Sequence, residues 1–269
     1  CLTIIQYLPA VSNMSTSTST GTLFDATENG DIGIVMELIQ SKADVNVLND
    51  QGSTPLMIAV HRGDVACVQA LIDAKADIEA KNKNGFTSLM SAVDKGHVTC
   101  SQLLIDSKAN LKAVNNSGAA ALMCAVDKGQ TACAQLLIDA KANIEAVDKY
   151  EYTPLLAAAI AGHAACVQAL LDAKADIRAK SVEGCTAAIM ASVRGRLDCL
   201  RVLLDAKADV ESKDNFEFTP LLSAARQGNV ACVEVLIAAK ANIEARDDAR
   251  YTPLALAAHN GFIDCVRVL

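Results

Sequence analysis

The strongest constraint on the fold is a period of 33 residues that runs through the chain without slippage. The phrase ACVQALIDAKADIEAK at residues 66–81 returns as ACVQALLDAKADIRAK at residues 165–180, three periods later. Two residue types keep the same step, at Gly30, Gly63, Gly96, Gly129, Gly162, Gly195, Gly228 and Gly261 and at Cys67, Cys100, Cys133, Cys166, Cys199, Cys232 and Cys265. A fixed period of this length predicts one supersecondary unit stacked on copies of itself.

The composition supports a continuous core and argues against several classes of partner. Apolar residues make up 52% of the chain, but Trp is absent, so the core is expected to consist of small aliphatic side chains and Cys. The net charge of −7 argues against nucleic acid or an anionic membrane as the partner, because both require a basic face. The apolar runs are far shorter than the ~18–20 residues of a membrane span, so no membrane insertion is expected.

The first residues differ from the array. Residues 1–20 are expected to be a disordered or non-native lead-in, with Met14 as a candidate natural start. Residues 1–41 contain no Lys or Arg, which argues against a secretory signal or a transit peptide and favours a cytoplasmic protein. The array is expected over residues 21–269, in units at about 21–48, 49–81, 82–114, 115–147, 148–180, 181–213, 214–246 and an incomplete 247–269.

The ten cysteines are expected to be buried, reduced packing residues. Equivalent residues of stacked helices lie roughly 8–10 Å apart, whereas a disulfide needs Cα atoms within ~7 Å. No Cys-x-x-Cys pair occurs, and Zn–S bonds of ~2.3 Å exclude a cluster at that spacing. Reduced thiols favour a reducing compartment.

One complete unit, residues 49–81, shows the expected local structure. Thr54 and Pro55 predict the start of a short helix, with the threonine as its cap and Gly63 at its end. A second, longer helix begins near Val65 behind Asp64, which is a candidate cap. The unit is therefore turn, short helix, longer helix and extended exit.

These residues resemble the ankyrin-repeat family. The helix opening Thr-Pro-Leu occurs at residues 54–56, 153–155, 219–221 and 252–254, and weakened versions occur at 87–89, 120–122 and 186–188. The resemblance covers about residues 21–269 and implies an all-α solenoid of helix-turn-helix units with hairpin-like turns. It also implies contact with a partner through the turns and the ends of the first helices.

The chain departs from the family pattern at two positions. The family's His after Thr-Pro-Leu is replaced by an apolar residue, which is expected to be core: Met57, Met90, Met123, Leu156, Ile189, Leu222 and Ala255. The family's Gly after the second helix is replaced by Lys42, Lys75, Lys108, Lys141, Lys174, Lys207 and Lys240. A left-handed Lys costs on the order of 1 kcal/mol relative to Gly, and a cation at a helix C-terminus recovers about 0.3–1 kcal/mol. We expect a lysine row on the outer flank, either solvated or facing an acidic partner.

No catalytic, cofactor or metal motif is found in the sequence, so the chain is not expected to be an enzyme. His97 and His163 begin second helices and are expected to be caps or local hydrogen-bonding groups, while His61 and His259 end first helices. Stacking displaces equivalent groups by ~10 Å per unit, which opposes the convergence that catalysis needs.

The aromatic residues give the candidate binding site. We use "turn" for the five residues before each helix opening, namely 49–53, 82–86, 115–119, 148–152, 181–185, 214–218 and 247–251. Six of the nine Phe and Tyr lie in turns, and with Ile160 they form the predicted partner-binding set: Phe86, Tyr150, Tyr152, Ile160, Phe216, Phe218 and Tyr251. A demand of the fold is expected to recur in every copy, which favours an exposed patch. The alternative is that the rings only cover neighbouring turns.

The sequence therefore predicts a scaffold or adaptor that binds another protein on a concave surface. An alternative is that the array is the targeting or regulatory segment of a larger enzyme or channel that continues beyond Leu269. A third interpretation is a structural spacer with no dedicated partner.

Overall fold

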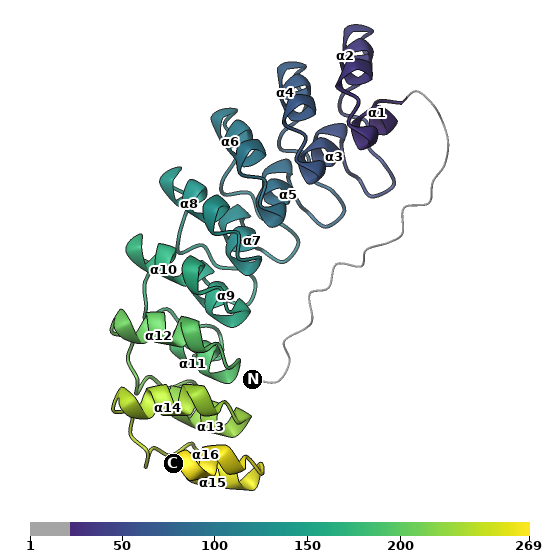
Figure 1. Cartoon of the computed structure of the whole chain (residues 1–269). Coiled ribbons are helices and arrows are strands. Elements are labelled where there is room, and N and C mark those ends of the chain that lie inside the picture. Colours follow the sequence, from purple (N-terminus) through teal and green to yellow (C-terminus); the bar gives the residue numbers. More distant parts are fainter. Residues whose placement is uncertain (1–21) are drawn as a thin grey trace.

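The computed structural model describes residues 22–269, which form sixteen helices in eight stacked pairs (Figure 1). The predicted all-α solenoid is confirmed. The first helices of the units are α1 Leu23–Asn29, α3 Pro55–Arg62, α5 Ser88–Lys95, α7 Ala121–Asp127, α9 Pro154–Ala161, α11 Ala187–Val193, α13 Pro220–Gln227 and α15 Pro253–His259. The second helices are α2 Ile32–Gln40, α4 Val65–Asp73, α6 Val98–Asp106, α8 Thr131–Asp139, α10 Ala164–Asp172, α12 Leu197–Asp205, α14 Val230–Ala238 and α16 Ile263–Val268. The expected lead-in at 1–20 lies outside the described residues.

The helix ends follow the local sequence signals. In α3 the Thr54 hydroxyl accepts a hydrogen bond from the Met57 amide at 3.3 Å, and Pro55 occupies the first helical position. The predicted Asp64 cap of α4 is confirmed, since its carboxylate accepts from the Cys67 amide at 3.0 Å. Each such cap stabilises its helix by about 1 kcal/mol.

The array is curved, with the first helices on the inside of the arc and the second helices on the outside (Figure 1). We call the inner side the concave face. The first helices carry a fully buried alanine at one position, which lets them approach closely: Ala59, Ala92, Ala125, Ala158, Ala191, Ala224 and Ala257. The second helices carry a buried leucine instead, at Leu71, Leu104, Leu137, Leu170, Leu203 and Leu236. First helices of adjacent units pack more closely on each other than second helices do, and an array that is closer-packed on one side curves toward that side.

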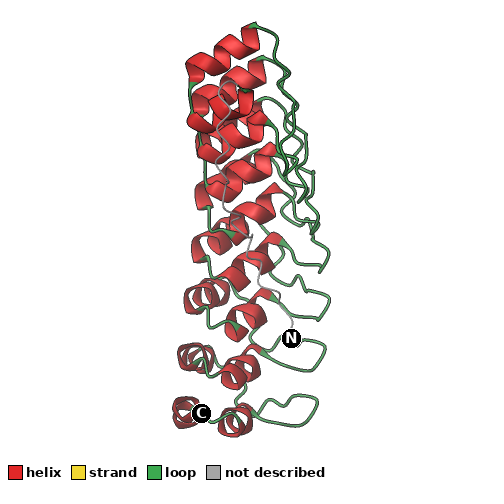
Figure 2. Cartoon of the chain, turned by 90° about the vertical axis from the view of Figure 1, so that its right-hand side faces the viewer, coloured by secondary structure: helices red, strands yellow, loops and turns green. Residues whose placement is uncertain are grey.

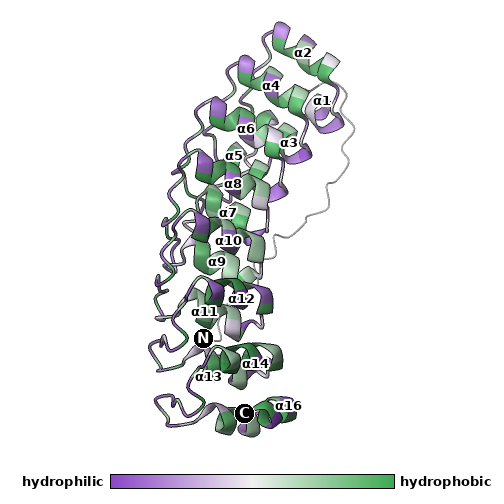
Figure 3. Cartoon of the chain, turned by 60° about the vertical axis from the view of Figure 1, so that its left-hand side comes forward, coloured by the Kyte–Doolittle hydropathy of each residue, from purple (hydrophilic) through white to green (hydrophobic). Residues whose placement is uncertain are grey.

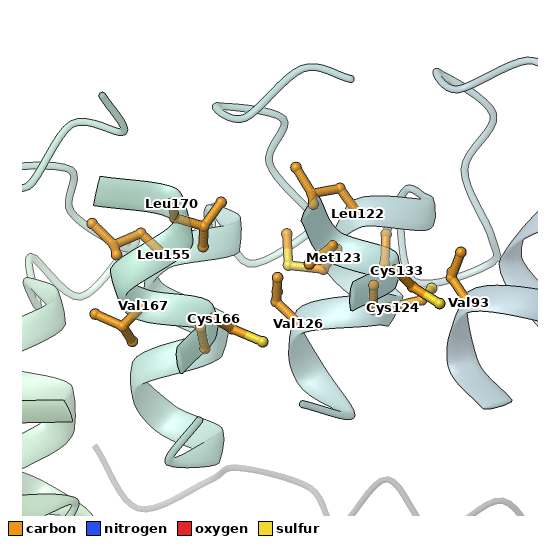
Figure 4. Packing of buried hydrophobic residues seen from close by; sticks show 14 of the residues in the cluster. Val93, Leu122, Met123, Cys124, Val126, Cys133, Leu155, Cys166, Val167 and Leu170 are labelled. Atoms are coloured by element: carbon orange, nitrogen blue, oxygen red, sulfur yellow. The ribbon is translucent and has the colours of Figure 1, made fainter. Parts of the chain in front are cut away.

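The core is continuous from one unit to the next, and the predicted packing role of the cysteines is confirmed for the described ones. Figure 4 shows buried side chains of α7–α10 in this core, including Met123, Cys133 and Cys166. The nine described cysteines are buried thiols. Burial raises the pKa of the Cys232 thiol to about 11. The stripe that replaces the family's His is also core, apart from Ala255, which is partly exposed.

Neighbouring units are linked by polar side chains that follow the glycines at the ends of the first helices. Nε2 of His97 bonds the carbonyl of His61 at 3.1 Å, and Nε2 of His163 bonds that of Asp127 at the same distance. The expectation of caps or local bonds was wrong for both histidines, because neither caps its own helix and each partner lies 36 residues earlier. These side chains cap the first helix of the preceding unit instead.

The turns project together from one edge of the array (Figure 2). Hydrophobic residues concentrate in the helices, while helix ends and loops are largely hydrophilic (Figure 3). Within residues 22–269, no helix has the length and apolar character that crossing a membrane requires.

Candidate interaction surface

The aromatic residues occupy two different positions of the turn. Tyr150 and Phe216 are third in their turns, which is the tip. Phe86, Tyr152, Phe218 and Tyr251 are fifth, directly before the threonine that caps the first helix. The two positions have different surroundings, which the sequence pattern does not distinguish.

At the fifth position the rings are mostly packing residues. Phe218 is only 8% exposed, so the expectation of an exposed ring is wrong for it. Phe86 and Tyr152 are half-buried and pack against the main core. Burial, and to a smaller extent the nearby Glu183 carboxylate, raise the pKa of Tyr152 to about 12.

The reason is an alternation of large and small side chains over two units. The fifth residue runs Ser53, Phe86, Ala119, Tyr152, Cys185, Phe218 and Tyr251. A ring therefore stands beside a small neighbour, and a cavity of about 30 Å³ lined by Cys185 and Phe218 remains between two of them. A packing demand therefore need not recur in every copy: here it recurs in every second copy from Phe86 to Phe218, and the exposed Tyr251 breaks the alternation.

The tip rings are exposed. The exposed fractions are 46% for Tyr150 and 50% for Phe216, and Tyr251 of the last turn reaches 45%. The rings of Tyr150 and Tyr152 lie 6.2 Å apart, which makes one pair from an exposed and a half-buried ring. Ile160, at the end of α9, is half-buried against the core.

Successive turns are joined by backbone hydrogen bonds, in which the tip carbonyl accepts from the second residue of the next turn. The Asn116 amide donates to the Asn84 carbonyl at 3.1 Å. This close approach requires glycine at the fourth position, where Gly85 has φ 77° and a Cβ atom would lie 2.5 Å from Asn116 Oδ1. Glycine thus supplies both the left-handed conformation and the space.

The aromatic tips are followed by glutamate instead of glycine, and the link to the next turn is weaker there. Glu151 and Glu217 are left-handed, with φ 60° and 63°. After Glu217 the linking bond, from the Asp248 amide to the Phe216 carbonyl, lengthens to 3.4 Å. After Glu151 no such bond to the Tyr150 carbonyl exists among residues 22–269. A side chain at the fourth position occupies space that the next turn fills where this residue is glycine. The next turn therefore cannot approach as closely.

An open groove lies between the turns 214–218 and 247–251. Its volume is about 470 Å³. The floor contains Phe218 and Leu256, which with Leu222 and Ala245 form a small hydrophobic cluster separate from the main core. The remaining lining residues are Phe216, Arg226, Asp247, Asp248, Ala249, Tyr251, His259 and Asn260.

Two cationic or titratable side chains from the first helices stand against these rings. The Arg226 guanidinium lies 5.0 Å from the centroid of the Phe218 ring, a cation–π arrangement. The His259 ring lies 6.2 Å from the Tyr251 ring. Within the described chain, no carboxylate is within ion-pair distance of Arg226, which is exposed.

The same helix ends are neutralised in α5 and α7. Lys95 pairs with Asp94 at 3.9 Å, and Lys128 pairs with Asp127 at 3.1 Å. From α9 onward the position occupied by Asp94 and Asp127 carries no carboxylate: it is Ile160, Val193, Arg226 and His259. The charges at this position are therefore self-paired in α5 and α7, and no carboxylate occupies the position from α9 onward.

The predicted lysine row is confirmed in its exposure, and its backbone is left-handed. All seven lysines have φ between 62° and 71° and are exposed at the ends of the second helices. In unit 49–81, however, Lys75 is flanked two residues away on either side by Asp73 and Asp77, both exposed. At least one carboxylate lies two residues away from six of the seven lysines, so the row is not a basic surface and an acidic partner is disfavoured there.

In the part of the chain that the structure describes, no group of His, Cys, Asp or Glu side chains is placed to hold a metal ion. Burial raises the pKa of the Cys124 thiol to about 12, which leaves it a poor nucleophile.

Arg226 was not among the predicted site residues, although it stands at a helix end that the resemblance implicates. The sequence signal was available: among the seven equivalent positions, Arg226 is the one arginine. Its stacking on Phe218 could not be read from the sequence, because Phe218 belongs to the turn before α13 and its ring position depends on packing.

Comparison with known proteins agrees with this architecture. The sequence model described as "Ankyrin repeats (3 copies)" matches residues 23–115, 62–148, 104–181, 122–214 and 189–269. The chain therefore belongs to the ankyrin-repeat family. Ankyrin repeats generally mediate protein–protein interaction, and the fold is typically non-catalytic.

Solved structures give the same result for the fold. The crystal structure of the human ASB11 ankyrin repeat domain superposes with a TM-score of 0.73 at 27% identity, covering 81% of this chain and 98% of that one. In all, 575 solved chains match, a number too large to single out a partner. No curated protein sequence matched the chain.

Proposed function

We propose that this chain is an interaction scaffold that holds another protein on its concave face, with the principal contacts in the units from 148 to 269. The observation that carries the proposal is the groove between turns 214–218 and 247–251, which combines exposed rings with an unpaired guanidinium. Aromatic and arginine side chains of this kind dominate the energetics of protein interfaces.

The predicted binding residues divide into two roles under this proposal. Tyr150, Phe216 and Tyr251 touch the partner directly, since their rings are about half exposed. Phe218, Tyr152, Phe86 and Ile160 are at least half-buried, so they support the surface and do not provide its main contacts. Phe218 and Tyr152 lie beneath the exposed rings, and Phe86 and Ile160 flank them. The continuous core holds these groups in place before binding, so little ordering free energy is lost on association.

We further propose a reducing, cytoplasmic location. The support is the set of nine thiols, all buried in the core of the described array. Cysteines persist as thiols where glutathione and thioredoxin keep them reduced.

A displayed library of folded domains and peptides, selected against the array, tests the proposed function. We expect selected binders to lose at least tenfold in affinity for the double variant Phe216→Ser and Tyr251→Ser. The matched control is Val65→Ser with Val98→Ser, which removes two valines, each 39% exposed, from the second helices. Binders that tolerate the first pair and fail on the second would place the interaction on the convex side and refute the proposal.

A further inference from the structure

The groove next to Arg226 has a composition that specifies the chemistry of what it binds. The guanidinium lies over the Phe218 ring at 5.0 Å, is exposed, and has no carboxylate partner among residues 22–269. A guanidinium stacked on an aromatic ring keeps its N–H edges available, and their fork geometry fits a carboxylate with two parallel hydrogen bonds.

One carboxylate in each of the two turns beside the groove is engaged within its own turn. Asp214 accepts the amides of Phe216 and Phe218 at 2.9 Å, inside its own turn. Asp247 is 7% exposed and accepts the Tyr251 amide at 2.7 Å.

Two further acidic residues complete the local charge inventory. Glu217 forms an ion pair with Lys213. Asp248 lines the groove from the turn 247–251, and is the exposed acid that faces it from that side. The groove therefore has a cationic rim on the side of α13 and an acidic rim on the side of the last turn.

The floor between these rims is apolar. Phe218 and Leu256 are buried there, and the exposed rings of Phe216 and Tyr251 stand on either side. A ligand that satisfies both the floor and Arg226 needs an apolar side chain adjacent to a carboxylate.

Resting on the proposed function, we infer that this groove binds an extended segment of a partner protein in which Glu or Asp adjoins Leu or an aromatic residue. The carboxylate pairs with Arg226, and the apolar side chain lies on the floor between Phe216 and Tyr251. The equivalent helix end in unit 148–180 carries Ile160 and Ala161, which offer no cation. The helix end beside the turn 148–152 therefore cannot pair with the carboxylate.

Peptide binding by the purified chain tests this inference. The probes are two fluorescent eight-residue peptides with blocked ends, one alternating Leu with Glu and one alternating Leu with Gln. We expect the Glu peptide to bind at least tenfold more tightly, since a hydrogen bond to a charged group contributes about 1.5–3 kcal/mol and about 1.4 kcal/mol is tenfold. The net charge of −7 repels the Glu peptide from the array as a whole, so this preference reports a local cation.

Substitutions identify the cation. Arg226→Gln is expected to abolish the preference for Glu while leaving the Gln peptide's affinity within about threefold. Arg201→Gln, which removes an exposed arginine from α12, is expected to change neither affinity. Phe216→Ser is expected to weaken both peptides equally. Thermal unfolding of each variant verifies that it is folded.

Three results would overturn the inference. These are equal binding of the two peptides, a preference for Glu that survives Arg226→Gln, and no binding of either peptide. Each leaves the proposed function standing if library-selected binders still depend on Phe216 and Tyr251, so the two failures are distinguishable.

Discussion

Turns 82–86 and 214–218 are built on one plan, and their differences separate what the fold requires from what it permits. Both place an aromatic ring at the fifth position and a left-handed residue at the fourth. In the first, Gly85 lets the next turn pack close, with a linking bond of 3.1 Å after the Asn84 tip. In the second, Glu217 replaces glycine, the link lengthens to 3.4 Å, and a groove opens beside Phe216.

The helix ends repeat the same contrast. In the first half of the array the cations of α5 and α7 are paired with neighbouring aspartates, whereas Arg226 of α13 stacks on a ring and remains without an ion pair in the described chain. A strained, loosened turn beside an unpaired cation departs from what packing alone favours. Such local departures in an otherwise regular array mark the region where binding is expected.

The largest expected effect separates the buried ring from the exposed ring of one turn. Phe218→Ala removes a side chain that is 8% exposed and is expected to lower the free energy of unfolding by about 3 kcal/mol. Phe216→Ala, at 50% exposure, is expected to change it by less than about 0.5 kcal/mol. Urea unfolding followed by circular dichroism measures both. Similar losses for the two variants would contradict the division into packing and contact residues.

Tyr152 offers a test of burial through pH. Its pKa is raised to about 12, from about 10 in an unfolded chain, chiefly by burial. The folded state therefore holds the proton more tightly, and this contribution to stability is complete below about pH 10 and is lost as pH rises from about 10 to about 12. Absorbance at about 295 nm, where the phenolate absorbs, is expected to show a phenol titrating near pH 12 that is absent from Tyr152→Phe. Ionisation of all tyrosines near their ordinary pKa of about 10 would show that Tyr152 is solvated.

A left-handed residue in a turn and one at the end of a second helix are expected to respond differently to substitution by glycine. Glu151→Gly, at a residue that makes no ion pair within residues 22–269, relieves about 1–2 kcal/mol of backbone strain and loses about 0.5–1 kcal/mol to the greater flexibility of the unfolded chain, for a net gain of about 0.5–1 kcal/mol. Lys141→Gly also loses a cation at a helix C-terminus, about 0.3–1 kcal/mol, so its net change is expected to be near zero. Paired thermal and urea melts measure both. A larger gain from Lys141→Gly would contradict the assigned role of the lysine row.

The smallest effect is expected at the helix ends that carry ion pairs. Asp127→Asn breaks an exposed ion pair with Lys128 and is expected to cost less than about 0.5 kcal/mol. Because Lys128 then loses its partner, the variant also asks whether an unpaired cation suffices for peptide binding. No gain in affinity for the Leu–Glu peptide is expected, since the groove that supplies the apolar floor lies beside α13 and not beside α7. A gain in affinity would show that an unpaired cation is sufficient for binding and that the groove is not required.

The sequence alone was sufficient for the repeat, the helix order and the core. The 33-residue step placed Thr54, Gly63 and the cysteine ladder correctly, because each is fixed by interactions within a unit or between equivalent neighbours. The exposed lysine row was also predicted, and its left-handed backbone is the conformation with which many helices end.

The site was predicted less completely, because it depends on pairs of different residues from adjacent units. The burial of Phe218 follows from the small Cys185 one unit earlier, and the position of Arg226 follows from that ring. The reach of His97 back to His61 likewise crosses a unit boundary. A 33-residue period hides relationships that recur only in every second unit or occur once.

Hydrogen–deuterium exchange of the array, with and without a library-selected binder, tests the central claim most directly because it changes no residue. We predict slower exchange of amides in turns 214–218 and 247–251 on binding, with no change in turns 49–53 and 82–86. Protection confined to the second helices, or to turns 49–53 and 82–86, would contradict the assignment of the binding surface to the C-terminal half of the concave face.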